Sequence, residues 1–353
     1  MTVQPEADPG ASVLVVNAGS TSLKLSAVGV DGSAESIRSL EAVPRDIVAV
    51  AHRVVHGGTL FRRPVVIDDD VVRALGELAE LAPLHNGPAV GTIRQVRRAL
   101  PDVPHIAVFD TAFHATIPDA AATYAVSQRW RDDWGVRRYG FHGLSVQWAT
   151  ERVQVPRLVV CHLGGGCSVT AVRDGRSVDT SMGFSPLEGV PMATRSGSID
   201  PAIVIHLLRT GKMKLEEVSW ALERESGLLG LSGVSARVEE LERSPETAAR
   251  LALDVFTYRV AVAVAAMAVA AGGIDALVFT AGVGEGSARV RERVCRRLRF
   301  LGVELDPERN ASARPDSDVA APGSGARIVV LRAREDVVAA RSARALLGLA
   351  AQP

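Results

Sequence analysis

Lysine is scarce in this sequence, which has only Lys24, Lys212 and Lys214 among its 40 basic residues. Arginine therefore supplies nearly all of the positive charge, and 40 acidic residues balance it to a formal net charge of zero. A chain without a basic excess lacks the electrostatic attraction that drives binding to nucleic acid or to anionic membranes. We therefore expect neither nucleic acid nor a membrane as a partner.

Cysteine is also scarce, and Cys161, Cys167 and Cys295 are odd in number and lack the paired spacing of a zinc site. This excludes a disulfide framework and fits a reducing compartment, so we expect a cytoplasmic protein. The start, "MTVQPEADPG", has no basic segment followed by an apolar run. We therefore expect no signal peptide, and disorder over residues 1–11.

Long apolar runs are absent too. The longest, "VAVAVAAMAVAA" at residues 260–271, is shorter than the roughly 20 residues that span a bilayer. We interpret it as a buried helix. At 353 residues, 47% of them hydrophobic, the chain is long enough for about two globular domains.

Three glycine-rich turns each follow an apolar strand. Residues 12–28 and 157–172 both predict a strand, a small-residue turn and a second strand, which indicates a duplicated architecture. In residues 276–294 the glycine-rich turn opens a charged helix instead. Backbone N–H groups at such turns and at a helix start favour an anion such as a chain of phosphates.

The segments between these turns alternate strands with amphipathic helices. Residues 47–55 and 105–110 predict buried strands, and residues 71–81 and 145–153 predict helices. This alternation predicts an α/β fold. We place one domain at residues 1–150 and a second at 151–336, with a C-terminal helix at 337–353 packing on the first.

Several polar residues stand beside these strands and turns. Arg53 ends a strand and Arg195 lies in a Gly/Ser loop, where a guanidinium can bind phosphate or carboxylate oxygens. Asp110 ends a buried strand, where a carboxylate needs a metal, a cation or several donors. His52 and His56 have the i, i+4 spacing of a zinc pair, but their segment predicts a strand, so we do not expect zinc there.

Ten ordered motifs make the sequence resemble the acetate and propionate kinase family from residue 13 to about 347. They are "NAGSTSLKL", "HRVVHGG", "LAPLHNGPA", "VFDTAFHATIP", "RRYGFHGLS", "HLGGGCSVTAV", "MGFSPLEGVPMATRSGSIDP", "LLGLSGVS", "FTAGVGEG" and "EDVVAARSA". The resemblance implies a duplicated actin-like, ribonuclease H-like fold with the active site in the interdomain cleft. It also implies reversible, Mg²⁺- or Mn²⁺-dependent phosphoryl transfer between ATP and acetate, giving acetyl phosphate and ADP, and a homodimer.

The resemblance also implies roles for single residues. Arg53 and Arg195 would hold the acyl carboxylate and the phosphoryl group, and His142 would stabilise its equatorial oxygens. Asp110 and Glu335, with Asn17, would position the metal. The implied acetate pocket is Val55, Leu84, Phe141 and Pro186, and the implied nucleotide contacts are Asn17, Ser20, Ser22, Lys24, His162, Gly164, Gly165, Gly166, Gly282 and Gly284.

The sequence departs from the family pattern mainly on the nucleotide side. Gly165 and Gly286 stand where asparagines are usual, and Arg237 and Glu239 reverse the charges of the usual Asp-x-Arg. Leu144, Val146 and Arg334 are further departures, in place of Thr, His and Asn. Three alternatives therefore stay open beside the ATP-dependent acetate kinase: propionate as the acceptor, a donor other than ATP (another nucleotide or pyrophosphate), and a sensor without catalysis.

Overall fold

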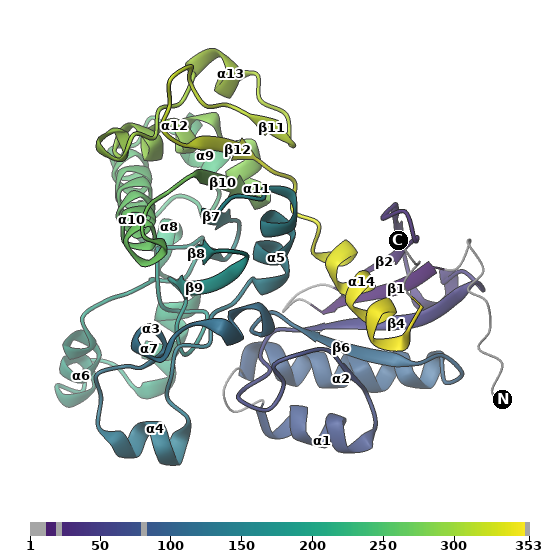
Figure 1. The fold of residues 1–353 in the computed structure, drawn as a ribbon. Helices are drawn as coiled ribbons and strands as arrows, with labels where there is room; N and C mark the ends of the chain where they lie inside the picture. Colours follow the sequence, from purple (N-terminus) through teal and green to yellow (C-terminus); the bar gives the residue numbers. More distant parts are fainter. Residues whose placement is uncertain (1–11, 19–22, 79–82, 350–353) are drawn as a thin grey trace. The chain divides into compact units, whose positions relative to one another are not determined.

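The structure is a computed structural model, and it describes residues 12–18, 23–78 and 83–349. Contacts divide the chain into two compact units (Figure 1). Unit 1 holds the described residues up to Ala115, with Phe141–Trp148 and those from Arg334 onward. Unit 2 holds Thr116–Gly140 and Ala149–Ala333.

Unit 1 contains a six-stranded mixed sheet with the order β3-β2-β1-β4-β6-β5. The three strands β1, β4 and β6 are parallel, while β2, β3 and β5 run antiparallel to their neighbours. The strands are β1 (Ser12–Ala18), β2 (Leu23–Val28), β3 (Ala34–Ile37), β4 (Ile47–Val54), β5 (Val65–Val66) and β6 (His105–Phe109).

Register aligns polar residues at the carboxyl ends of the parallel strands. Asn17 on β1 pairs with Arg53 on β4, and Asp110 directly follows β6. Adjacent parallel strands end at the same edge of a sheet, and ligand sites of open α/β sheets lie at that edge. The topology of unit 1 thus brings three of the candidate residues together.

Helices cover both faces of this sheet, as expected for its buried parallel strands. On one face, α14 (Glu335–Leu347) buries Val338, Ala339 and Ala343 against β1 and β4, and Figure 1 shows it beside them in yellow. Leu144 of α5 (Gly143–Arg152) joins the same core. On the other face lie α1 (Asp69–Glu77) and α2 (Pro83–Ala99). The C-terminal helix thus packs on the sheet of unit 1.

Unit 2 repeats the topology of unit 1. Its sheet order, β11-β12-β10-β7-β8-β9, matches that of the first sheet when read from the other end, and the pattern of parallel and antiparallel pairs is the same. The predicted α/β class and the predicted duplication are therefore confirmed. The strands are β7 (Arg157–Leu163), β8 (Cys167–Arg173), β9 (Arg176–Thr180), β10 (Ala276–Thr280), β11 (Ser317–Asp318) and β12 (Arg327–Val330).

The helices of unit 2 differ from the sequence prediction after β10. The glycine-rich stretch predicted as a turn is itself a short helix, α11, and the charged helix that follows is separate. The unit contains α3 (Asp119–Ala122), α4 (Gln128–Trp134), α6 (Pro201–Arg209), α7 (Leu215–Arg224), α8 (Gly227–Ser232), α9 (Val238–Arg243), α10 (Thr247–Ala271), α11 (Ala281–Gly286), α12 (Ala288–Arg296) and α13 (Pro307–Ala311). Short 3₁₀ turns lie at Leu40–Ala42, Ala112–Thr116 and Arg299–Leu301.

Helix α10 is longer than predicted, because it begins at Thr247 and not at residue 260. Within the described residues it is the one helix whose length and composition would suffice to cross a membrane. Half of its most apolar window is nevertheless buried inside the unit, where the helix packs on β7 and β8. Its apolar character is thus that of a core helix.

Candidate active site

Arg53 is the centre of a buried ion network in unit 1. Its Nε and Nη2 donate to Oδ1 and Oδ2 of Asp110 at 3.0 and 2.7 Å, and its Nη1 lies 2.7 Å from Oε2 of Glu335. The side chains of Arg53 and Asp110 are 16% and 2% exposed. Burial alone would lower the pKa of Arg53, but the two carboxylates outweigh burial and raise it. The guanidinium is therefore fixed in position and permanently charged.

Glu335 also presents an oxygen with an open coordination position. Its Oε1 is buried and has no hydrogen-bond partner among the described residues. Carboxylate oxygens suit Mg²⁺, which usually keeps several waters and needs only one or two protein carboxylates beside substrate phosphates. The described residues contain no cluster of three or more His, Cys, Asp or Glu that would bind a metal alone. The donor set of Asp110 and Glu335 thus fits a hydrated magnesium ion shared with a phosphate substrate.

His142 stands in a strained backbone conformation beside this network. Its φ is +61°, in the left-handed region that side chains rarely adopt. The next residue, Gly143, donates its N–H to the carbonyl oxygen of Asp110 at 2.9 Å, and a Cβ at Gly143 would overlap that oxygen. Strain of this kind is maintained at functional sites by the surrounding structure. The glycine lets the start of α5 approach the end of β6, and this brings His142 to Asp110.

Phe141 is buried next to His142 and is positioned by two histidines. Nε2 of His114 donates to the carbonyl oxygen of Phe141 at 2.9 Å, and the His56 ring contacts the Phe141 ring edge-on at 5.4 Å. Burial lowers the pKa of His114 to about 4, so this histidine is neutral at physiological pH. Sequence reasoning assigned His114 no role at the site, because a lone histidine is most often a core residue.

The other unit 1 candidates are less completely described. Val55 is half-buried directly after β4, and Lys24 is exposed on β2 opposite Asn17. Leu84 lies in α2, but its side chain is outside the described residues, and so are Ser20 and Ser22. The structure therefore places Asn17, Arg53, Asp110, Phe141, His142 and Glu335 in one unit.

In unit 2 the glycine-rich β7–β8 hairpin and the short helix α11 line one pocket. Gly164 and Gly165 come from the β7–β8 hairpin, and Gly282 and Gly286 from α11. A Cβ added at Gly165, Gly282 or Gly286 would meet nothing within 4 Å beyond its own chain neighbourhood. None of these three has a positive φ, so neither packing nor backbone conformation requires glycine there. Space left open by glycines, with backbone amides beside it, is typical of a phosphate site.

Two further residues that line this pocket, Arg237 and Glu239, are departures from the family pattern. The complete lining is Gly164, Gly165, Ala193, Ala236, Arg237, Val238, Glu239, Gly282, Val283, Gly286 and Ser287. His162, Gly166 and Gly284 do not belong to it, and Gly284 is buried against the backbone of Phe279. The charge-reversed pair forms its own ion pair at 3.2 Å between Arg237 and Glu239, which satisfies both charges within α9 and its cap.

Arg195 lies in the same unit, in an irregular loop that also reaches this pocket. Its Nη1 approaches the carbonyl oxygen of Pro186 at 3.5 Å, and burial lowers its pKa. Two residues earlier in the loop, Ala193 donates its N–H to the carbonyl oxygen of Gly165 at 3.3 Å. The backbone of this loop therefore connects Arg195 to the glycine hairpin.

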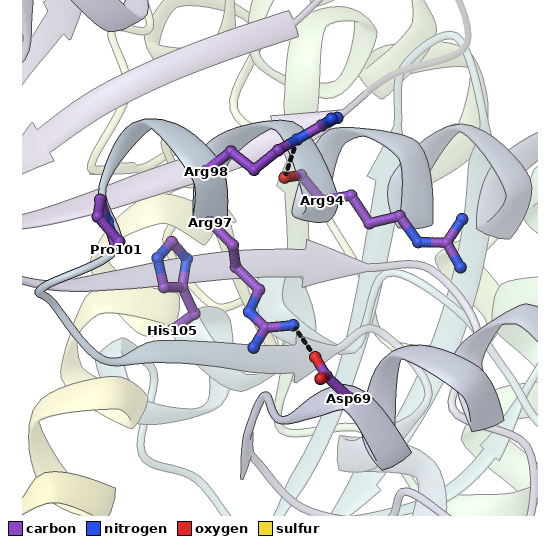
Figure 2. Close-up of a pocket in the computed structure, with 6 residues that line it drawn as sticks. All are labelled: Asp69, Arg94, Arg97, Arg98, Pro101 and His105. Carbon is purple, nitrogen blue, oxygen red and sulfur yellow. Dashed lines mark hydrogen bonds and ion pairs between the residues drawn. The ribbon is translucent and has the colours of Figure 1, made fainter.

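A second hollow, in unit 1, holds none of the candidate residues (Figure 2). Arg97 points to Asp69, with 2.8 Å between Nη1 and Oδ1, while the guanidinium groups of Arg94 and Arg98 point away from that pair. The three arginines do not converge on one point, so they do not form an anion site. The remaining lining residues are Pro101 and His105.

A buried histidine pair lies behind this hollow. Nε2 of His52 and Nδ1 of His105 are 2.9 Å apart, and Nε2 of His105 donates to the carbonyl oxygen of Leu100. Burial lowers the pKa of both, that of His52 to about 3. His52 therefore uses its Nε2 atom to bind His105.

The sequence matches the Acetokinase family over residues 35–341. It is 46% identical to the acetate kinase of Nostoc punctiforme over 302 residues (82% of this chain and 74% of that protein). It is 44% identical to that of Gloeobacter violaceus (89% and 82%). The structure resembles a propionate kinase from Francisella tularensis, with a TM-score of 0.87 and 32% identity over 94% of this chain and 98% of that one. The acetate kinase of Porphyromonas gingivalis gives a TM-score of 0.84 at 30% identity over 96% and 100%.

Because Gly143 closely approaches the backbone of Asp110, one added methyl group at this position should destabilise the fold. We expect Gly143→Ala to lower the free energy of unfolding by about 2 kcal/mol or more, because its Cβ would overlap the carbonyl oxygen of Asp110. Urea unfolding of the variant and of the wild-type chain measures this change in the free energy of unfolding. Gly91→Ala is the control, since Gly91 is an open position in α2 where alanine should stabilise by up to about 1 kcal/mol. Equal effects of the two substitutions would contradict the packing described here.

The buried histidines predict a loss of stability in acid. Their pKa values lie below the ordinary 6.5, so between pH 7 and pH 5 the unfolded chain gains protons that the folded chain does not. The contribution of each buried histidine to the free energy of unfolding is therefore fully present above pH 6.5. It is lost as the pH decreases, and the loss is about 2 kcal/mol per histidine at pH 5. Urea unfolding at pH 7 and pH 5 should show a smaller drop for His52→Asn than for the exposed control His206→Asn. An identical drop in the two variants would refute this assignment.

Proposed function

The chain belongs to the Acetokinase family and is a phosphotransferase acting on acetate, and we propose that it transfers the γ-phosphoryl group of ATP directly to acetate in a magnesium-dependent, reversible reaction. An acetate oxygen attacks the γ-phosphorus, the bond to the leaving ADP oxygen breaks, and acetyl phosphate and ADP result. The observation that carries this proposal is the fixed guanidinium of Arg53, held by Asp110 and Glu335.

The chemistry needs little from the protein besides alignment and charge neutralisation. Acetate is ionised at neutral pH, so no general base is required to activate it. The obstacle is repulsion between an anionic nucleophile and an anionic phosphoryl group. Phosphoryl transfer is catalysed mainly by positioning and by electrostatic stabilisation of the phosphoryl oxygens. Permanently charged arginines and a histidine donor are suited to both tasks.

We assign the roles as follows. Arg53 and Arg195 bind the carboxylate and the phosphoryl group, and His142 donates to the equatorial oxygens. The methyl group of acetate packs in an apolar pocket formed by Val55, Leu84, Phe141 and Pro186. The burial of Phe141 and the histidine contacts that fix it support this pocket, because a rigid wall limits the size of the acid.

Asp110 and Glu335, with Asn17 beside them on β1, would hold Mg²⁺ or Mn²⁺. When bound, the metal would neutralise negative charge on the nucleotide phosphates. The buried, unpartnered Oε1 of Glu335 supports this assignment. Arg53 fixes both carboxylates, so they would already be ordered when the metal binds.

The glycine-lined pocket of unit 2 would bind the nucleotide. Gly165 and Gly282 have open space beside their backbones, which supports contact with the phosphates, and Gly164 lines the same pocket. Further phosphate-side contacts are assigned to Ser20, Ser22, Lys24, His162, Gly166 and Gly284. A cytoplasmic location and a homodimer complete the proposal.

One assay tests the proposal and its alternatives together. Acetyl phosphate formation is measured with acetate and Mg²⁺, with ATP, GTP or pyrophosphate as the donor, and with propionate replacing acetate in a parallel series. We expect ATP to support the fastest turnover and acetate to be used at least as well as propionate. One methylene changes the barrier by only about 1 to 3 kcal/mol, so some propionate turnover is also expected. Turnover with pyrophosphate alone, or ligand binding without turnover, would overturn the proposal.

A further inference from the structure

Arg138 binds the start of an irregular loop, residues 181–198, that forms no helix or strand. Its Nη1 donates to the carbonyl oxygens of Thr180 and Met182 at 2.9 and 3.0 Å, and its Nη2 donates to Oε1 of Glu188 at 2.9 Å. The Arg138 side chain is 16% exposed. One guanidinium thus joins the beginning of the loop to a residue several positions further along.

Tyr124 binds the carboxylate oxygen of Glu188 that Arg138 does not bind. Its hydroxyl group donates to Oε2 of Glu188 and accepts the N–H of Phe184 at 2.9 Å, while the Arg138 guanidinium lies 5.5 Å from the centre of its ring. Burial raises the pKa of Tyr124, so the hydroxyl keeps the proton that it donates. Gly183 lies between these groups, where a Cβ would overlap Glu188 and Tyr124.

The loop held in this way carries two residues of the proposed reaction. Pro186 lies between Phe184 and Glu188, and its carbonyl oxygen is the acceptor 3.5 Å from Nη1 of Arg195. Among the described residues, the stretch from Phe184 to Glu188 makes no backbone–backbone hydrogen bond, whereas the later part of the loop does, for example from Met192 N–H to the carbonyl oxygen of Arg195. Side-chain contacts therefore determine the shape of the stretch that contains Pro186. The position of Pro186 against Arg195 therefore depends on the side-chain contacts at Phe184 and Glu188.

We propose that Arg138, Tyr124 and Glu188 form a clasp that positions Pro186 and Arg195 for acetate. The clasp residues touch no substrate and are positioning residues. This inference rests on the function proposed above, because it assigns the acetate side of that site. Arginine is required at position 138, since a planar fork reaches two carbonyl oxygens and a carboxylate at once, whereas a lysine ammonium is a single point donor.

The kinetic test separates the two substrates. We expect Arg138→Lys to raise the KM for acetate about tenfold or more and to lower kcat, with the KM for ATP changed less than about twofold. Tyr124→Phe should shift the same constants in the same direction by a smaller factor. The KM for ATP is expected to change less, because the part of the loop that reaches the nucleotide pocket is held by a backbone hydrogen bond of its own, from Ala193 N–H to the carbonyl oxygen of Gly165 at 3.3 Å.

The matched control is Arg129→Lys, which alters an exposed ion pair with Asp133 in the same segment and should leave all constants unchanged. Equal rises in both KM values, or an acetate KM within twofold of wild type, would overturn the clasp. A general loss of folding would change the kinetic constants for both substrates alike. A selective rise in the KM for acetate is therefore a result that a purely structural role does not give.

A second measurement is independent of turnover. Hydrogen–deuterium exchange followed by mass spectrometry should show faster exchange over residues 181–188 in Arg138→Lys, with β7 unchanged. Unaltered exchange in the loop would contradict the clasp. If the wild-type chain formed no acetyl phosphate, the proposed function would fail, and the exchange result would still decide whether Arg138 holds this loop.

Discussion

The ion network of Arg53 is the interaction on which unit 1 depends. It joins three elements that are far apart in the chain: the end of β4, the residue after β6 and the first residue of α14. Burying a guanidinium is costly, and two carboxylates with short hydrogen bonds offset that cost only in this geometry. The carboxyl edge of the sheet and the C-terminal helix are therefore tied to one point. In the proposed reaction, the same point would supply the positive charge and the carboxylate oxygens that phosphoryl transfer requires.

Glycine has two different functions around the proposed reaction. At Gly143 the absence of a side chain allows α5 to touch the backbone of Asp110, and this close approach determines where His142 stands. At Gly165 and Gly286 no described atom outside the immediate chain lies within 4 Å of an added Cβ, and in the proposed function this open space would be for the nucleotide. Without the asparagine amides that are usual at these two positions, the proposed phosphate contacts would come from backbone N–H groups, which donate to any phosphate chain and are compatible with ATP.

The sequence predicted the parts of the fold that local patterns encode. Apolar strands followed by small-residue or glycine-rich stretches identified β1, β7 and β10, and the similarity of the segments that contain β1 and β7 predicted the duplication. Two boundaries were wrong for physical reasons. Charged residues on the exposed side of α10 interrupt its apolar run, and the glycines of α11 conceal a helical turn. The clasp was not predicted, because Tyr124 and Glu188 are 64 residues apart and hydrophobic periodicity carries no information on such pairs. The family motifs supplied the candidate residues, and the strand register explains why Asn17, Arg53 and Asp110 meet.

Arg53→Lys tests the central claim most directly, since it keeps the charge but removes the planar fork that binds Asp110 and Glu335 together. The measurement is kcat/KM for acetate at saturating ATP and Mg²⁺, on a variant whose circular dichroism shows the native fold. The account predicts a loss of at least about 100-fold, because the remaining ammonium cannot hold both carboxylates and the substrate in one geometry. A value within about threefold of wild type would show that the fixed guanidinium is not what the reaction depends on.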